Sequence, residues 1–156
     1  MNLKESYFPY SDKYDLPSYD ILDEEYELLY FQPICEIRYP LRFIRRRIID
    51  KMNMFIHFFQ NIIYPISGSI VSLEENNFLT EDDKKEVVEL LKKMISLERE
   101  SLLLDIDHDE SSDGEFIQKV HVQWLSFKPR LVFFIHKLQK EWKEKTHNDI
   151  GEHYFG

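Results

Sequence analysis

The chain has 156 residues, a formal net charge of −9 and only four glycines. One domain of ordinary size accounts for that length. The few glycines fit no phosphate-binding loop and no dinucleotide-binding fingerprint, which excludes the enzyme classes that depend on them. The negative charge disfavours nonspecific nucleic-acid binding, because neutralising phosphates needs clustered Lys and Arg.

Cys35 is the single cysteine, which excludes an internal disulfide and a thiolate-rich zinc site. We expect a small buried side chain at this position and a reducing, cytoplasmic location. The first ten residues lack the cationic and apolar parts of a secretory signal. The most apolar window, 52–66, is shorter than the ~20 residues of a membrane span, so no membrane partner is predicted.

Charge alternates in blocks along the chain. Residues 1–33 and 67–115 are acidic, whereas residues 34–66 and 116–156 are basic. We expect these blocks to neutralise one another within the fold and to leave an acidic surface that suits a basic partner.

The first 35 residues are rich in Tyr and Pro and predict an extended aromatic arm. Phe8-Pro9 and Leu16-Pro17 are expected to be extended or turn dipeptides, because proline restricts itself and the residue before it. Residues 20–31 predict a short helix that Pro33 closes. The aromatic side chains are expected to pack over the helical body or to contact a partner.

Two long helices follow. The first is predicted from Pro40, a favourable first-turn residue, to about Tyr64, where Pro65 ends it. Residues 66–69 predict a turn, and the segment up to Phe78 gives no clear assignment. The second is predicted from Thr80, an N-cap followed by acids, to about Asp105.

The last helix has the strongest pattern, and it is predicted to end near Lys145. Large apolar residues recur every three or four positions, which predicts one buried helical face. The members of this stripe are Ile117, Val120, Trp124, Phe127, Leu131, Phe134 and Leu138. The pattern continues in phase across Pro129, which favours one helix with a proline kink over two helices.

The predicted fold is therefore all-α: an antiparallel bundle of three long helices, with a short N-terminal helix and the aromatic arm. It forms one domain over residues 1–156, divided into an arm (1–35), a bundle (36–146) and a flexible tail (147–156). Homodimerisation through the broad stripe of the last helix is an additional prediction.

Five arginines crowd the start of the first long helix, where the helix dipole disfavours cations. They are Arg38, Arg42, Arg45, Arg46 and Arg47. An anion is therefore expected nearby. It is either the acidic segment 20–27 of the same chain, through ion pairs, or an external phosphate or RNA.

The acidic stretch 105–115 contains a weak metal-site candidate. Asp109, Ser111 and Asp113 with Gly114 resemble the opening half of a calcium loop, but the closing bidentate Glu is missing. A solvated acidic loop without a bound metal is the preferred interpretation. His57 and His121 have no partner at metal-ligand spacing and are expected to be core or boundary histidines.

Arg130 and His136 form an Arg-x5-His pattern in a helical domain. The pattern resembles the Arg-x4-6-His motif of HEPN-type ribonucleases. That resemblance implies that the two side chains act on the scissile RNA phosphate. The alternative is a surface arginine and a helix-boundary histidine.

The sequence shows no nucleophile paired with a base, no acid-base pair and no cofactor loop. The leading hypothesis is a non-catalytic protein-interaction module without a cofactor: an adaptor, inhibitor or immunity-type protein that presents acidic and aromatic surface to a protein partner. The alternative is a HEPN-like ribonuclease, or an inactive relative, acting through Arg130 and His136.

Overall fold

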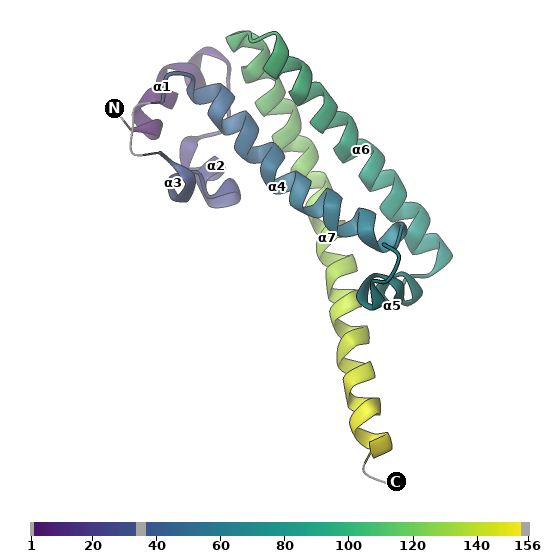
Figure 1. The fold of residues 1–156 in the computed structure, drawn as a ribbon. Helices are drawn as coiled ribbons and strands as arrows, with labels where there is room; N and C mark the ends of the chain where they lie inside the picture. Colours follow the sequence, from purple (N-terminus) through teal and green to yellow (C-terminus); the bar gives the residue numbers. More distant parts are fainter. Residues whose placement is uncertain (1, 34–36, 154–156) are drawn as a thin grey trace. The chain divides into compact units, whose positions relative to one another are not determined.

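The computed structural model describes residues 2–33 and 37–153, and Cys35 lies outside them. In this described part the chain is all-helical, with seven helices and no strand (Figure 1). The all-α prediction is confirmed. None of the described helices is both long enough and apolar enough to cross a membrane.

Three short helices are followed by three long ones and one short connector. The helices are α1 (Leu3–Lys13), α2 (Tyr19–Tyr26), α3 (Leu28–Phe31), α4 (Pro40–Ile63), α5 (Ile70–Phe78), α6 (Glu81–Ile106) and α7 (Glu110–His153). The chain divides into two compact units. The first unit contains residues 1–56 and 92–124, and the second contains 57–91 and 125–156.

The predicted extended arm is wrong over residues 3–13, which form α1. Pro9 lies inside this helix, although Phe8-Pro9 was expected to be extended or a turn. Asn2 and Glu5 form a reciprocal capping box at its start, and Leu3 and Tyr7, four residues apart, bury one face. These contacts outweigh the backbone hydrogen bond that Pro9 cannot donate. Leu16-Pro17 does lie outside any helix, as expected.

The predicted helix over 20–31 is two helices, α2 and α3, separated at Glu27. The backbone of Glu27 is left-handed, with φ 54° and ψ 43°. Its amide donates to the Asp23 carbonyl, which ends α2, while the Asp23 carboxylate accepts from the Leu29 amide at the start of α3. A local turn at Glu27 therefore interrupts what the sequence presents as one apolar face.

The long helices begin close to where they were expected. α4 begins at Pro40 and ends at Ile63, and Thr80 accepts from the Asp83 amide just before α6. α7 differs at both ends: it begins at Glu110, inside the predicted loop 107–114, and it continues to His153, beyond Lys145 and into the predicted tail. Pro129 lies inside α7, so the prediction of one continuous helix through this proline is confirmed.

All seven residues of the predicted stripe in α7 are buried. The stripe therefore packs within the chain, and homodimerisation through it stays a prediction. In the first unit Ile44, Ile48 and Met52 of α4 are buried too. In the second unit Phe59 of α4 contacts Phe134 of α7 edge to face, with ring centroids 6.3 Å apart.

Candidate functional site

Arg45 lies at the centre of a buried charge network in the first unit. Its side chain has no exposed surface, and neither has that of Asp113. Arg45 Nε donates to Asp113 Oδ1 at 2.6 Å, Nη1 donates to the Ser101 carbonyl at 2.8 Å, and Nη2 donates to Asp105 Oδ1 at 2.5 Å. One arginine of α4 thus fixes the end of α6 and the start of α7.

The neighbouring arginines also have partners within the chain. Arg42 donates to the Asp105 carbonyl at 2.8 Å, and Arg46 donates to the Asp105 carboxylate at 3.1 Å. Arg47 pairs with Asp50 at 2.9 Å and lies over the Phe31 ring, 3.5 Å from its centroid. Arg38 lies 5.3 Å from the centroid of the Tyr39 ring.

The acids that engage the arginines differ from those expected. Asp105 and Asp113 come from the end of α6 and the first turn of α7, whereas the acidic segment 20–27 was predicted to cover the cluster. Burial alone would raise the pKa of Asp105, but hydrogen bonds from Arg45 and Arg46 lower it by more, so the net shift is downward. Four of the five arginines, all but Arg38, therefore have a carboxylate partner within the described part of the chain.

The three residues of the calcium-loop candidate occupy the start of α7. Asp109 precedes the helix, and its carboxylate accepts from the Ser112 amide at 2.9 Å and from the Ser112 hydroxyl at 2.7 Å. Ser111 lies in the first turn, and Asp113 is committed to Arg45. The structure, over its described residues, contains no group of three or more His, Cys, Asp or Glu placed to hold a metal ion.

Gly114, read from the sequence as the turn glycine of that loop, is helical and serves close packing. A Cβ added at Gly114 would lie 3.1 Å from the Tyr14 ring. The Tyr14 hydroxyl donates to Glu110 at 3.0 Å, which fixes the ring in place. The absence of a side chain thus lets the N-terminal segment approach α7.

His108 borders the same network. Its Nδ1 lies 3.1 Å from Asp113 Oδ2, at ion-pair distance but without hydrogen-bond alignment. The His108 ring meets the Tyr39 ring edge to face at 4.9 Å. A cavity of about 20 Å³ adjoins these side chains, which is room for one water molecule.

A second polar cluster fastens α2 to α4 and α7 within the first unit. The Glu25 carboxylate accepts from the indole of Trp124 at 2.6 Å and forms an ion pair with Lys51 at 3.7 Å, and Lys51 also donates to the Glu25 backbone carbonyl. The Tyr26 hydroxyl and His121 Nδ1 share a hydrogen bond of 2.9 Å. Burial lowers the pKa of His121 from its ordinary value and raises that of Tyr26. His121 is thus a hydrogen-bonded core histidine, as expected.

Arg130 and His136 lie on α7 in the second unit. Arg130 makes a two-pronged ion pair with Glu86 of α6 and lies over the rings of Phe133 and Phe134. His136 is exposed. Six helical residues place the two side chains about 120° apart around the helix axis. The hydrogen bonds from Arg130 lower the pKa of Glu86.

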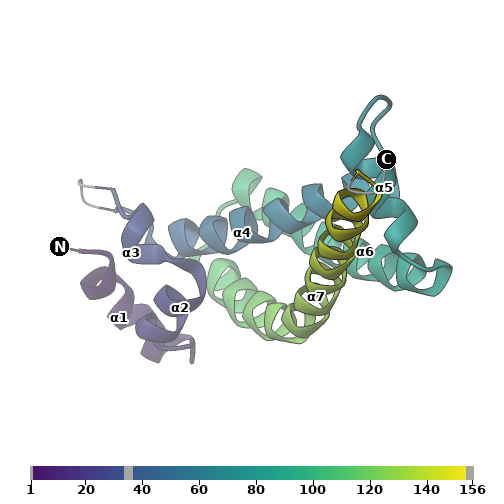
Figure 2. The ribbon, with the colours of Figure 1, turned by 90° about the horizontal axis from the view of Figure 1, so that it is seen from below.

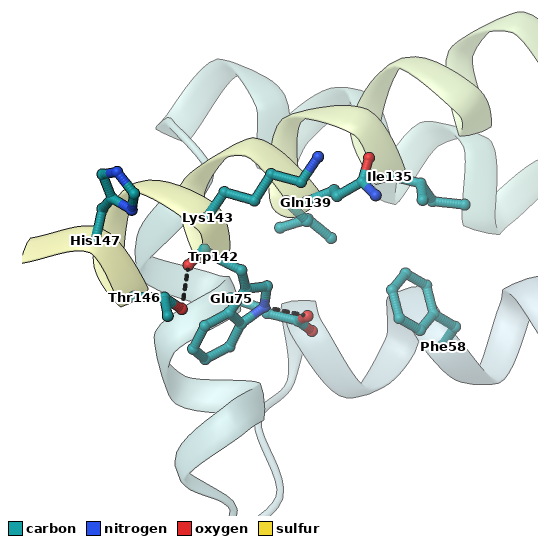
Figure 3. A pocket seen from close by; sticks show the side chains of 9 residues that line it. Phe58, Glu75, Ile135, Gln139, Trp142, Lys143, Thr146 and His147 are labelled. Carbon is teal, nitrogen blue, oxygen red and sulfur yellow. Dashed lines mark hydrogen bonds between the residues drawn. The ribbon is translucent and has the colours of Figure 1, made fainter. Parts of the chain in front are cut away.

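The second unit also contains an open apolar groove of about 680 Å³ (Figure 3). Phe58 of α4, Glu75 of α5 and a face of α7 line it. The α7 residues are Ile135, Leu138, Gln139, Trp142, Lys143, Thr146 and His147.

The Trp142 side chain in the groove is held in place by contacts with α5. Its indole nitrogen donates to Glu75 at 3.0 Å, and its ring meets Phe78 edge to face at 5.1 Å. Next to it, Lys145 pairs with Glu74 at 2.6 Å. These contacts hold α5 against α7, and Trp142 also lines the groove (Figure 3).

Sequence reasoning missed this groove. Trp142 follows Leu138 by four residues and continues the apolar stripe, so extending the pattern by one turn finds it. Phe58 and Glu75 carry no such signal, because they come from other helices and reach the groove only in the folded chain.

Comparison of the chain with models of protein families, with curated proteins and with solved structures finds no match. The candidate sites therefore depend on geometry alone.

Proposed function

We propose that the chain is a non-catalytic protein-interaction module, of the adaptor, inhibitor or immunity type, that binds a protein partner through the groove of the second unit. The supporting observation is the apolar floor formed by Ile135, Leu138 and Trp142 with Phe58 opposite. The remaining acidic surface of a chain with net charge −9 suits a partner that is basic overall.

The proposed occupant is one amphipathic helix of that partner. From Ile135 to His147 the groove follows α7 for about 18 Å, which equals three to four turns of a docked helix. The apolar face of the docked helix would lie on the apolar floor of the groove. Gln139, Lys143 and His147 recur every four residues along one rim and would bind acceptors at the helix edge.

We further propose that the three long helices form one antiparallel bundle. The order of the ion pairs supports this within each unit. In the first unit Arg42 and Arg45 meet Asp105 and Ser101 in reverse order, and in the second unit Asp83 and Glu86 meet Lys137 and Arg130 in reverse order.

A photo-crosslinking amino acid placed at Gln139 tests the proposal, with Lys140 as the matched control. Lys140 is one residue along the same helix and does not line the groove. We expect a protein adduct from native extract at position 139 only, with Trp142→Ala reducing its yield at least tenfold, because the indole supplies the largest apolar surface. Equal adducts at both positions, or none, would contradict it.

An RNA assay provides the counter-test for the ribonuclease alternative. Purified protein is incubated with mixed RNA, with His136→Ala as control. We expect no cleavage that depends on His136, because Arg130 is engaged by Glu86. Cleavage that is lost in His136→Ala would overturn the interaction module in favour of the HEPN-like activity.

A further inference from the structure

The connection between α4 and α5 exposes an unusual amount of apolar surface. Five large side chains within ten residues are each 51–75% exposed. We call them the α4–α5 patch: Tyr64, Ile66, Ile70, Val71 and Leu73. Tyr64 and Ile66 lie in the turn between α4 and α5, which Figure 2 shows, and Ile70, Val71 and Leu73 lie in α5.

The amphipathic order of α5 is inverted. Ser72 is the buried residue of α5, while Ile70, Val71 and Leu73 are exposed. An isolated exposed leucine needs no explanation, but a contiguous group of this kind marks an interaction surface.

The patch is held in a defined shape by polar contacts. Asn76 donates to the Ile62 carbonyl at the end of α4 at 2.8 Å. The Ser69 amide donates to the Ile66 carbonyl at 3.0 Å, and the Ser69 hydroxyl accepts from the Ser72 amide at 3.3 Å. Gly68 turns the chain with φ +87°, and a Cβ added there would meet no atom within 4 Å apart from its chain neighbours, so the tip is open to a partner.

The lack of charge in this segment favours a second copy of the chain as the occupant of the patch. Between Lys51 and Glu74 the chain carries no Asp, Glu, Lys or Arg. Two copies of a chain with net charge −9 repel each other over most surfaces, but this uncharged patch meets its own copy without like-charge contacts. A different protein, in contrast, would find no charged side chain in the patch with which to form a selective ion pair.

The area fits a small dimer. Side chains of this kind present roughly 150 to 200 Å² each when fully exposed, so the patch amounts to about 500 to 600 Å². Two copies would bury roughly 1,000 to 1,200 Å², which reaches the lower bound for a biological interface. We infer that the α4–α5 patch binds the same patch of a second copy, forming a two-fold symmetric homodimer.

Sedimentation velocity between about 1 and 200 µM tests this inference. We expect a reversible monomer–dimer equilibrium, and Ile70→Glu should raise its dissociation constant at least tenfold. Val122→Glu, also at an exposed aliphatic residue but in the first unit, should leave the constant unchanged. Both side chains are exposed, so helical content and melting temperature are expected to match the wild type in each variant.

Two further arms separate other occupants. Raising NaCl to 0.5 M should change the dissociation constant less than about threefold, because the interface contains no ion pairs. Co-sedimentation with phosphatidylcholine vesicles should be absent. A chain that stays monomeric, a dimer insensitive to Ile70→Glu or equally weakened by Val122→Glu, or vesicle binding that Ile70→Glu abolishes would overturn the inference. None of these outcomes bears on the groove, so the proposed function is tested separately.

Discussion

Arg45 and Asp113 form a fully buried ion pair in the first unit. The Arg45 guanidinium is saturated by Asp113, Asp105 and Ser101, and neither Arg45 nor Asp113 has exposed surface. Burial of such a pair adds little to stability compared with an apolar pair, because desolvation offsets the attraction. Removing Asp113, however, leaves the fully buried Arg45 with only the partly exposed Asp105 as its counter-charge.

Asp113→Asn is therefore expected to destabilise the fold by about 3 to 5 kcal/mol, measured by urea unfolding. The control is Arg46→Gln, because the Arg46 side chain is 53% exposed and its ion pair is worth less than about 1 kcal/mol. Similar losses in the two variants would show that the network is not the main source of the effect.

His121 makes stability depend on pH. Burial holds its pKa below the ordinary value of 6.5, so the unfolded chain takes up the proton first as pH falls. We expect the melting temperature to fall between pH 7.5 and pH 5.5 and the fall to be smaller in His121→Gln, whose side chain still bonds Tyr26. An identical fall in both proteins would assign the effect to other groups.

At the scale of elements, local backbone geometry overrides the apolar pattern. Residues 20–31 read as one helix, yet Glu27 is left-handed and divides it into α2 and α3. Residues 3–13 read as an arm, yet a capping box and two buried side chains form α1 around Pro9.

Glu27→Gly is expected to stabilise the chain by about 0.5 to 1 kcal/mol, because glycine adopts the left-handed region without steric cost. Glu24→Gly, in the exposed middle of α2, should instead cost about 1 kcal/mol. Urea midpoints compare the two. Destabilisation by Glu27→Gly would mean that the Glu27 carboxylate contributes more to stability than the left-handed backbone costs at a residue other than glycine.

At the scale of the whole molecule, each unit is assembled from segments far apart in sequence. α4, α6 and α7 each contribute to both units, so neither unit is a continuous stretch of chain. Helices that continue through both units are expected to couple their unfolding.

The two tryptophans report on this coupling, since Trp124 belongs to the first unit and Trp142 to the second. In Trp142→Phe and in Trp124→Phe the remaining tryptophan's fluorescence should give the same urea midpoint as far-ultraviolet circular dichroism of that variant. Midpoints that differ within one variant would show that the units unfold independently.

Sequence alone was enough to predict the all-helical class, the start of α4 at Pro40, the cap at Thr80 and the buried stripe of α7 through Pro129. These features depend on side-chain periodicity and on residues within one or two turns, which are readable locally. It also showed that the arginines need an anion, because the helix dipole is a local property.

Which acids pair with the arginines, and where the groove lies, could be learned only from the folded chain. Asp105 and Asp113 are 60 and 68 residues from Arg45 along the chain. Phe58, Glu75 and Trp142 likewise come from three helices. Side chains so far apart meet only when helices pack, and packing is chosen by the combined burial of all elements rather than by any local pattern.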